Sequence, residues 1–145
     1  MAKDDLEQLM NALIPFAQQM LKKEGEFYPF GVQMDAGGTI ALATADTGEE
    51  SPTTDRLIAM MTAGFQKAAK AGELRAAGIC YDVRVAEPGS DEKTDAICVK
   101  IEHADGEALV AYVPYRKGRL GGMKYGKLFA TKGEPTFFKK GGRGN

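Results

Sequence analysis

The chain has 145 residues, of which 43% are hydrophobic and 27% are charged, and its formal net charge is −1. This length and balance are typical of one globular domain with its own core, and no apolar run is long enough to span a membrane. The first residues are acidic where a secretory signal would be basic, so we expect a cytoplasmic protein with no membrane partner.

The residues that bind metals or form disulfides are few. The sequence contains two cysteines, Cys80 and Cys98, and a single histidine, His103. A disulfide framework needs denser cysteines, and a structural zinc site needs about four ligands. We therefore expect two reduced cysteines buried on strands, and we predict no metal and no cofactor.

The small net charge conceals a strong asymmetry along the chain. Residues 1–115 carry 19 acidic and 10 basic side chains, whereas residues 116–145 carry nine basic side chains and one acidic one, Glu134. Such an asymmetry indicates a basic arm for an acidic partner. The same arm could instead dock on the acidic body of its own or a neighbouring subunit.

The first predicted element is a helix over residues 4–24, because apolar side chains recur there at helical spacing. Asp4 is the expected N-cap, and Glu7 three residues later completes a capping box. Pro15 lies inside the pattern and should kink the helix, since proline has no N–H for the helical ladder.

A hairpin is predicted next, with strands over residues 27–34 and 39–45 joined by a glycine-rich turn. Its first strand contains the densest aromatic stretch of the chain. Alternation places Phe27 and Pro29 on one face and Tyr28 and Phe30 on the other. One pair can enter the core while the other lines a groove or a dimer interface.

A second helix is predicted after an acidic loop. Ser51 is the expected N-cap and Pro52 the first helical residue, a position that proline favours. A stripe of apolar residues from Leu57 to Ala68 should be buried, and Gly72 should end the helix.

Three strands are predicted over residues 77–85, 95–104 and 107–115, from their alternation of apolar and polar residues. Asp105-Gly106 is a strong hairpin signal. A two-residue turn there would pair Ile101 with Val110 and Val99 with Tyr112.

Together these elements predict an α+β fold. We expect an antiparallel sheet of five or six strands with two amphipathic helices, in the order helix-strand-strand-helix-strand-strand-strand. Residues 1–138 should form a single domain, in which residues 116–138 add one or two short strands. Residues 139–145 should form a flexible basic tail.

Two resemblances add to this interpretation. The order of elements resembles the profilin-like and roadblock-like folds, whose members are often binding or dimerisation modules, although a fold alone implies no activity. The stretch Gly25-Glu26-Phe27-Tyr28-Pro29-Phe30-Gly31, with Tyr125-Gly126 and Gly133-Glu134-Pro135, is similar to a group of small uncharacterised bacterial proteins. That similarity implies a bacterial protein folded up to about residue 138, and it implies no activity.

None of the candidate catalytic motifs in the sequence is complete. Residues 121–127 match most of a phosphate-binding loop, but Leu128 stands where a magnesium-binding Ser or Thr is needed, and no good helix follows. His103 has no evident partner, because Glu102 should point to the opposite face, so we expect a surface histidine. Neither Ser51 nor Ser90 lies in a nucleophile elbow. No catalytic residue is predicted.

The leading prediction is a non-catalytic binding or protein-interaction domain that self-associates through a sheet edge or a helix face. One alternative is a nucleic-acid binder that uses the basic, aromatic-containing C-terminal segment. Another is an enzyme or small-ligand binder with a pocket near Tyr28, Tyr81 and Tyr112. The candidate binding residues are Phe27, Tyr28, Phe30, Lys117, Arg119, Lys124, Tyr125 and Lys127.

Overall fold

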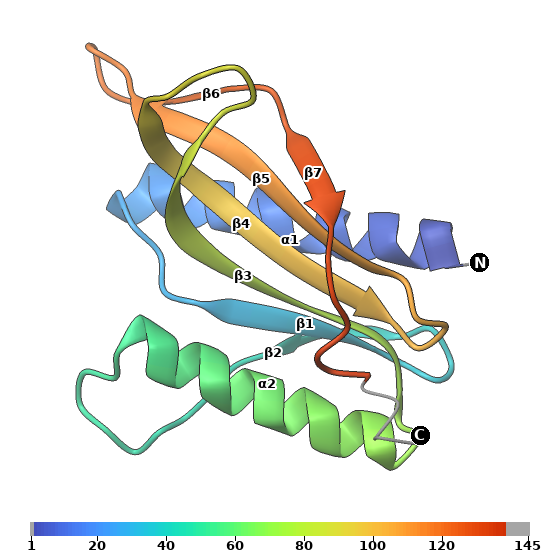
Figure 1. Ribbon diagram of the computed structural model, residues 1–145. Helices are drawn as coiled ribbons and strands as arrows, with labels where there is room; N and C mark the ends of the chain where they lie inside the picture. Colours follow the sequence, from blue (N-terminus) through green and yellow to red (C-terminus); the bar gives the residue numbers. More distant parts are fainter. Residues whose placement is uncertain (1, 139–145) are drawn as a thin grey trace.

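An open antiparallel sheet with a helix on each face forms the framework of the computed structural model, which describes residues 2–138 (Figure 1). The α+β class and the predicted order of elements are confirmed, but the described residues form seven strands rather than five or six. The elements are α1 (Ala2–Glu24), β1 (Phe30–Asp35), β2 (Ile40–Ala43), α2 (Thr54–Lys70), β3 (Leu74–Ala86), β4 (Lys93–His103), β5 (Ala108–Lys117), β6 (Met123–Tyr125) and β7 (Phe129–Lys132). The predicted tail, residues 139–145, lies outside the described residues.

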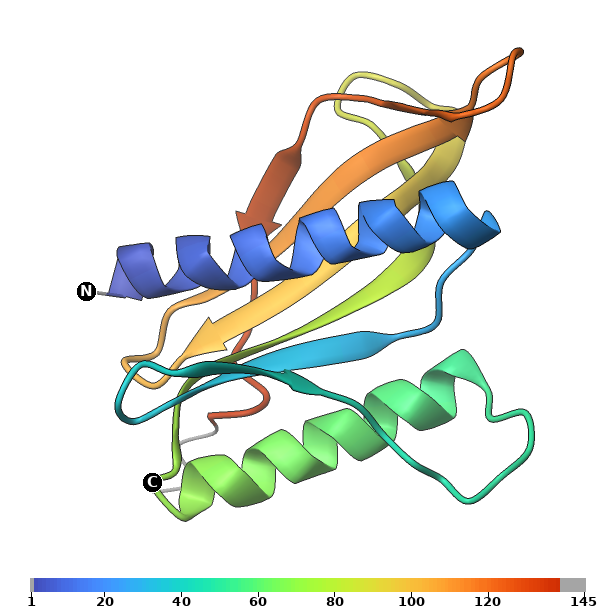
Figure 2. The same ribbon diagram turned by 180° about the vertical axis from the view of Figure 1, so that it is seen from behind.

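The sheet runs in the order β2-β1-β3-β4-β5, and both β6 and β7 pair with β5. Successive residues of β3 face opposite helices: Cys80 belongs to the core beneath α1, whereas Ile79 belongs to the core beneath α2. Figure 2 shows α1 crossing in front of the long central strands, with α2 along the β1–β2 side. The two helices therefore cover opposite faces of the sheet, as amphipathic helices require.

The larger core lies between α1 and the centre of the sheet. Its helix contributes a stripe that includes Leu9 and Leu13, both with no exposed surface, and α1 continues past Pro15 as one helix. A Cβ atom on Gly78 would lie 2.5 Å from Ile101 Cγ2 and 2.9 Å from Leu13 Cδ1. Glycine at this position therefore allows α1 to approach the sheet closely.

The smaller core lies under α2, where Leu57, Met61 and Phe65 are buried as predicted. Phe65 packs against β1 at Gly31, where a Cβ atom would lie 3.1 Å from the ring and 2.9 Å from a backbone oxygen of β3. The second glycine of the stretch Gly25–Gly31 is thus explained by the close approach of α2.

The segment after β7 is tied to this smaller core by the buried carboxylate of Glu102 on β4. That carboxylate accepts hydrogen bonds from the N–H of Thr136, the hydroxyl of Thr136 and the N–H of Phe137, each at 2.8 Å. The Phe137 ring packs edge-on against Phe65 with centroids 5.2 Å apart. The chain up to Phe138 is held to the sheet in this way.

Both predicted N-caps are wrong. The first helix begins at Ala2, so Asp4 lies within its first turn instead of capping it. The second helix is capped by Thr53, whose hydroxyl accepts the N–H of Arg56 at 3.1 Å. Thr53 has the extended backbone that is typical of an N-cap, with φ −75° and ψ 160°. Ser51 therefore lies before the cap, outside the helix.

The predicted register of the β4–β5 hairpin is also wrong by one residue. Ile101 pairs with Leu109, and Val99 pairs with Ala111. The turn contains three residues, because the His103 N–H donates to the Glu107 carbonyl at 2.8 Å and the Asp105 carboxylate accepts the Glu107 N–H. As a result Tyr112 lies on the α2 face and pairs with Cys98.

The first hairpin is shorter than predicted. Its strands cover Phe30–Asp35 and Ile40–Ala43, so Phe27, Tyr28 and Pro29 precede the sheet. These residues do not follow strand alternation: Phe27, Pro29 and Phe30 are all buried, whereas Tyr28 is 67% exposed.

Candidate functional site

The end of β5, the following turn and β6 form a projecting arm, which we define as residues 116–127 (Figures 1 and 2). A tight turn closes it, in which the Gly118 N–H donates to the Gly122 carbonyl at 2.8 Å. Gly121 and Gly122 have φ values of +87° and +74°, which favour glycine. Leu120 at the tip is fully exposed.

A groove of about 490 Å³ lies between this arm and the C-terminal half of α1. We call it the arm groove. Tyr125 pairs with Tyr115, which belongs to the core beneath α1, so Tyr125 also faces α1. Burial raises the pKa of the Tyr125 hydroxyl, which therefore stays protonated at neutral pH. The groove is lined by Pro15, Gln18, Gln19, Lys22, Gly122, Met123 and Tyr125.

The basic residues of the arm are divided between its two faces. Lys117 pairs with Met123 and so lies on the groove face of the arm, whereas Lys22 lines the groove from α1. Lys124 pairs with Arg116 on the opposite face. None of the ion pairs within residues 2–138 involves these four side chains.

The other candidate binding residues lie elsewhere. Phe27 and Phe30 are core residues whose rings meet edge-on with centroids 6.1 Å apart. Tyr28 lines a separate hollow with Glu50, Ser51, Pro52 and Leu57. Arg119 lies at the tip of the arm, and Lys127 lies exposed between β6 and β7. Of the predicted set, only Tyr125 lines the arm groove, while Lys117 lies on the same face of the arm.

Sequence reasoning missed the residues that α1 contributes to the groove. Gln18, Gln19 and Lys22 lie roughly 100 residues before β6 in the chain. Nothing in their local pattern distinguishes them from other polar residues on the exposed side of a helix. Only the packing of the arm against α1 gives them a shared surface.

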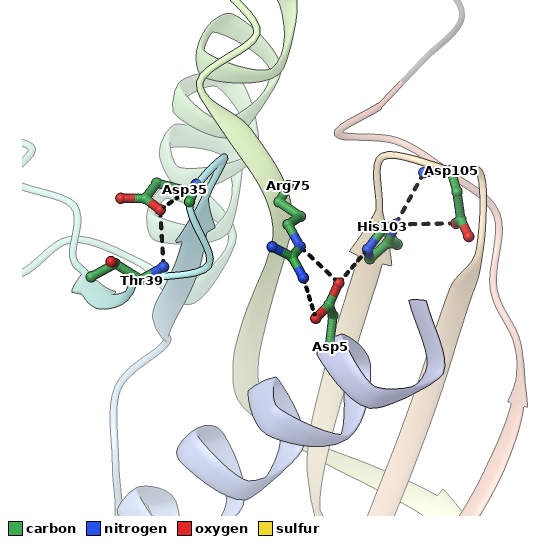
Figure 3. A network of polar contacts seen from close by, with 7 residues as sticks. Asp5, Asp35, Thr39, Arg75, His103 and Asp105 are labelled. Carbon is green, nitrogen blue, oxygen red and sulfur yellow. Dashed lines mark hydrogen bonds and ion pairs between the residues drawn. The ribbon is translucent and has the colours of Figure 1, made fainter. Parts of the chain in front are cut away.

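A second polar cluster ties the start of α1 to the ends of β3 and β4 (Figure 3). The Asp5 carboxylate is buried and accepts hydrogen bonds from Arg75 Nε at 2.9 Å and Arg75 Nη2 at 3.1 Å. His103 Nε2 lies 2.8 Å from the same carboxylate. The prediction that His103 is a surface residue without a partner is therefore wrong, because the partner comes from a residue 98 positions away.

The geometry of this cluster indicates a structural role. Hydrogen bonds from Arg75 and His103 lower the pKa of Asp5 to about 2, so Asp5 is ionised at neutral pH. His103 Nδ1 lies 3.1 Å from the Asp105 N–H, which donates to it. Both ring nitrogens are thus engaged, and His103 has no nitrogen left to act as a general base.

The cysteines also show no sign of reactivity. Cys80 pairs with Val99 and Cys98 pairs with Tyr81, which places the two thiols on opposite faces of the sheet. Burial raises the pKa of the Cys80 thiol well above its usual value and that of Cys98 to about 11. Both are therefore protonated and poorly nucleophilic at neutral pH.

Tyr81 and Tyr112 flank Cys98 on the α2 face. The hollow that Tyr28 lines includes neither of these two tyrosines. Within residues 2–138, neither that hollow, nor the arm groove, nor the hollow between β2 and α2 is lined by all three rings.

Comparisons of the chain with protein-family models, with curated proteins and with solved structures found no match. Within residues 2–138, no group of three or more His, Cys, Asp and Glu side chains is placed to hold a metal ion. None of the helices in that range is long and apolar enough to cross a membrane.

Proposed function

We propose that the chain is a non-catalytic binding domain that holds a short acidic segment of a partner protein in the arm groove. The observation that carries this proposal is the combination of a groove of about 490 Å³ with cations on its face that form no ion pair among the described residues. A concave, partly apolar surface with a few convergent polar groups is the usual form of a ligand site.

The chemistry of the groove lining suits such a segment. Lys22 in the lining, and Lys117 on the same face of the arm, can pair with carboxylates. The amides of Gln18 and Gln19 can bond the peptide backbone of the ligand, because each offers both donors and acceptors. Pro15, Met123 and Tyr125 give an apolar floor for one side chain of the ligand.

The remaining polar clusters support binding rather than catalysis. Both nitrogens of His103 are occupied by Asp5 and Asp105. The two thiols are protonated at neutral pH because they are buried. A nucleophile with an adjacent base is the usual minimum for covalent catalysis, and these groups do not supply one.

Nucleic acid fits the arm less well than a short acidic segment. Two of the arm's cations, Arg116 and Lys124, point away from the groove. Beyond β3, Glu87 lies beside Gly126 and begins a loop that also contains Asp91 and Glu92. A long polyanion that crosses the arm would approach these carboxylates.

The test measures how tightly the native chain and its variants bind a synthetic peptide in which glutamates surround one phenylalanine. Lys22→Glu should weaken its affinity about tenfold, because a paired cation becomes a like charge. Lys23→Glu is the matched control, with the same charge change one residue later on α1 but outside the groove lining, and it should change affinity less than about twofold. Equal effects of the two variants would contradict the proposal. Tighter binding of a single-stranded oligonucleotide than of the peptide would favour nucleic acid instead.

A further inference from the structure

A second feature, distinct from the arm groove, is the outer edge of β2. This strand is the last of the sheet on its side and has no neighbour beyond it among residues 2–138. Residues 39–45 read Thr-Ile-Ala-Leu-Ala-Thr-Ala, without a charge or a proline. Edge strands normally carry such residues to prevent pairing with other chains, so this edge lacks the usual protection.

The hydrogen-bonding groups of this edge can be assigned from its pairing with β1. The Asp35 N–H donates to the Thr39 carbonyl at 2.9 Å, so these two residues form a hydrogen-bonded pair. Antiparallel pairs alternate, and with Met34 opposite Ile40 and Val32 opposite Leu42, those two pairs are the non-bonded ones. Ile40 and Leu42 therefore direct their N–H and C=O groups outward, toward an additional strand.

A hollow of about 270 Å³ lies between β2 and α2, directly inside this edge, and we call it the edge hollow. It exists because the positions of β2 and its continuation that face α2 are small. Ala43 and Ala45 pack toward the α2 core, while the large residues Ile40 and Leu42 face the other way. The lining is Gln33, Ala43, Thr44, Ala45, Asp46, Met60, Met61, Gly64 and Phe65.

Gly64 is an independent sign that the edge hollow is kept open. It lies in the middle of α2, where glycine costs about 1 kcal/mol of helix stability relative to alanine. A Cβ atom there would meet nothing within 4 Å, so packing within residues 2–138 does not require glycine. Its position in the lining gives the backbone of α2 direct access to the hollow.

We infer that the β2 edge and the edge hollow together bind an extended segment of a partner protein by strand addition. Backbone groups of the segment would pair with Ile40 and Leu42. Its residues opposite Ala41 and Ala43 would point to the α2 face and fill the edge hollow. The volume exceeds the roughly 150 Å³ that holds a benzene molecule in an engineered cavity, so one aromatic or two aliphatic side chains fit.

The chemistry of the occupant follows from the lining. Large apolar residues are required at alternate positions, because Met60, Met61 and Phe65 form the walls of the hollow. A lysine or arginine is expected at the end beside Asp46, which lies in the lining and starts the acidic stretch 46–50.

A second copy of β2 would serve poorly as the occupant. With a twofold axis at Ala41, the antiparallel partner places Ala41 opposite Ala41 and Thr39 opposite Ala43. Ala41 and Thr39 of the second copy, which would face the edge hollow, are small, so the hollow would remain empty. This point favours a different protein over self-association.

The experiment selects a displayed library of random ten-residue peptides against the full chain. We expect enrichment of peptides with bulky apolar residues at alternate positions and a basic residue at one end. A synthetic peptide with this pattern should slow hydrogen exchange of the Ile40 and Leu42 amides. Leu42→Pro, which removes an outward N–H and no backbone hydrogen bond to β1, should abolish the interaction while the chain stays folded.

Two variants test the edge hollow itself. Ala43→Leu fills it from the strand and Gly64→Leu fills it from the helix, and each should weaken the peptide at least about tenfold. Ala63→Leu is the matched control, since Ala63 is exposed on α2 and does not line the hollow; it should change affinity less than about twofold.

Three outcomes would overturn the inference. The first is a selection without an alternating apolar pattern. The second is a peptide whose affinity is the same in Ala43→Leu and Ala63→Leu. The third is a homodimer in equilibrium sedimentation whose Ile40 and Leu42 amides are protected without any peptide, since a second copy would then occupy the edge.

Discussion

The two edges of the sheet differ in how they are protected. At the C-terminal edge, β5 is covered in two short pieces, β6 and β7, which carry Lys124 and Lys132. At the opposite edge, β2 is uncharged and exposes Leu42 to 58%. Charge and interruption prevent strand pairing, so the C-terminal edge is closed to strand addition while the β2 edge remains open to it.

The same difference extends to what anchors each side to the core. The chain beyond β7 is tied down by a buried carboxylate, Glu102, which collects hydrogen bonds from Thr136 and Phe137. The β2 side depends on main-chain pairing with β1 and on the packing of small side chains such as Ala43. One side is therefore held by polar contacts, and the other leaves space beneath α2.

The largest expected effect is the loss of the C-terminal anchor. Glu102→Ala leaves three backbone N–H groups and a hydroxyl without their acceptor, and we expect the free energy of unfolding to fall by about 3 kcal/mol. Hydrogen exchange should accelerate in residues 129–138 more than in β2. Glu107→Ala, at an exposed turn position, is the control and should stay within about 0.5 kcal/mol of the native chain. Equal acceleration at both edges would show that they are not anchored independently.

A smaller effect is expected from the loss of the Asp5 carboxylate, which lies at the ends of the central strands β3 and β4. Asp5→Asn weakens the contacts to Arg75 and His103, and chemical denaturation should show a loss of about 2 kcal/mol. Because Asp5 ties α1 to β3 and β4 rather than to an edge, exchange at β2 and β7 should change to the same degree. Faster exchange at only one of these two strands would show instead that Asp5 stabilises that edge of the sheet.

Acid should remove the contribution of Asp5 gradually. The pKa of Asp5 is lowered from 3.8 to about 2 in the folded chain, so its stabilising contribution is complete above about pH 4 and is lost as the pH falls toward 2. Thermal unfolding of the native chain and of Asp5→Asn should therefore converge over that range. A gap between their melting temperatures that stays constant down to pH 2 would contradict this assignment.

The smallest expected effect is a gain in stability beside the β2 edge. Gly64→Ala should raise the free energy of unfolding by about 0.5–1 kcal/mol, since alanine favours the helix and its methyl group meets nothing within 4 Å. Ala63→Gly, one residue earlier and outside the edge hollow, should lower stability by a similar amount. A loss of stability in Gly64→Ala would mean that Gly64 serves packing rather than access.

Periodicity in the sequence was enough to predict both helices, the order of the strands and the buried stripe of α2, because each depends on neighbouring residues. Periodicity failed where the structure depended on a single residue, as in the choice of N-cap and the length of a turn. The cap at Thr53 replaced Ser51, and a third turn residue shifted the register after His103. Both alternatives have compatible local sequences, and packing decides between them.

The candidate sites were harder to predict than the fold. Tyr125 was identified from the aromatic and basic content of the C-terminal segment, but Gln18 and Lys22, which line the groove with it, come from the first helix. The partnership of Asp5 with His103 spans 98 positions. Contacts between residues so far apart leave no trace in spacing, since spacing reports only what lies on the same element.

The exposed tip of the arm is a suitable position for a site-specific fluorescent label. Cys80 and Cys98 are buried and protonated at neutral pH, so a maleimide reagent should leave them unmodified in the folded chain. A cysteine introduced by Leu120→Cys would stand fully in solvent and take the label by itself. A fluorophore there would sense occupation of the arm groove, while the β2 edge, at the far side of the sheet, keeps its native surface.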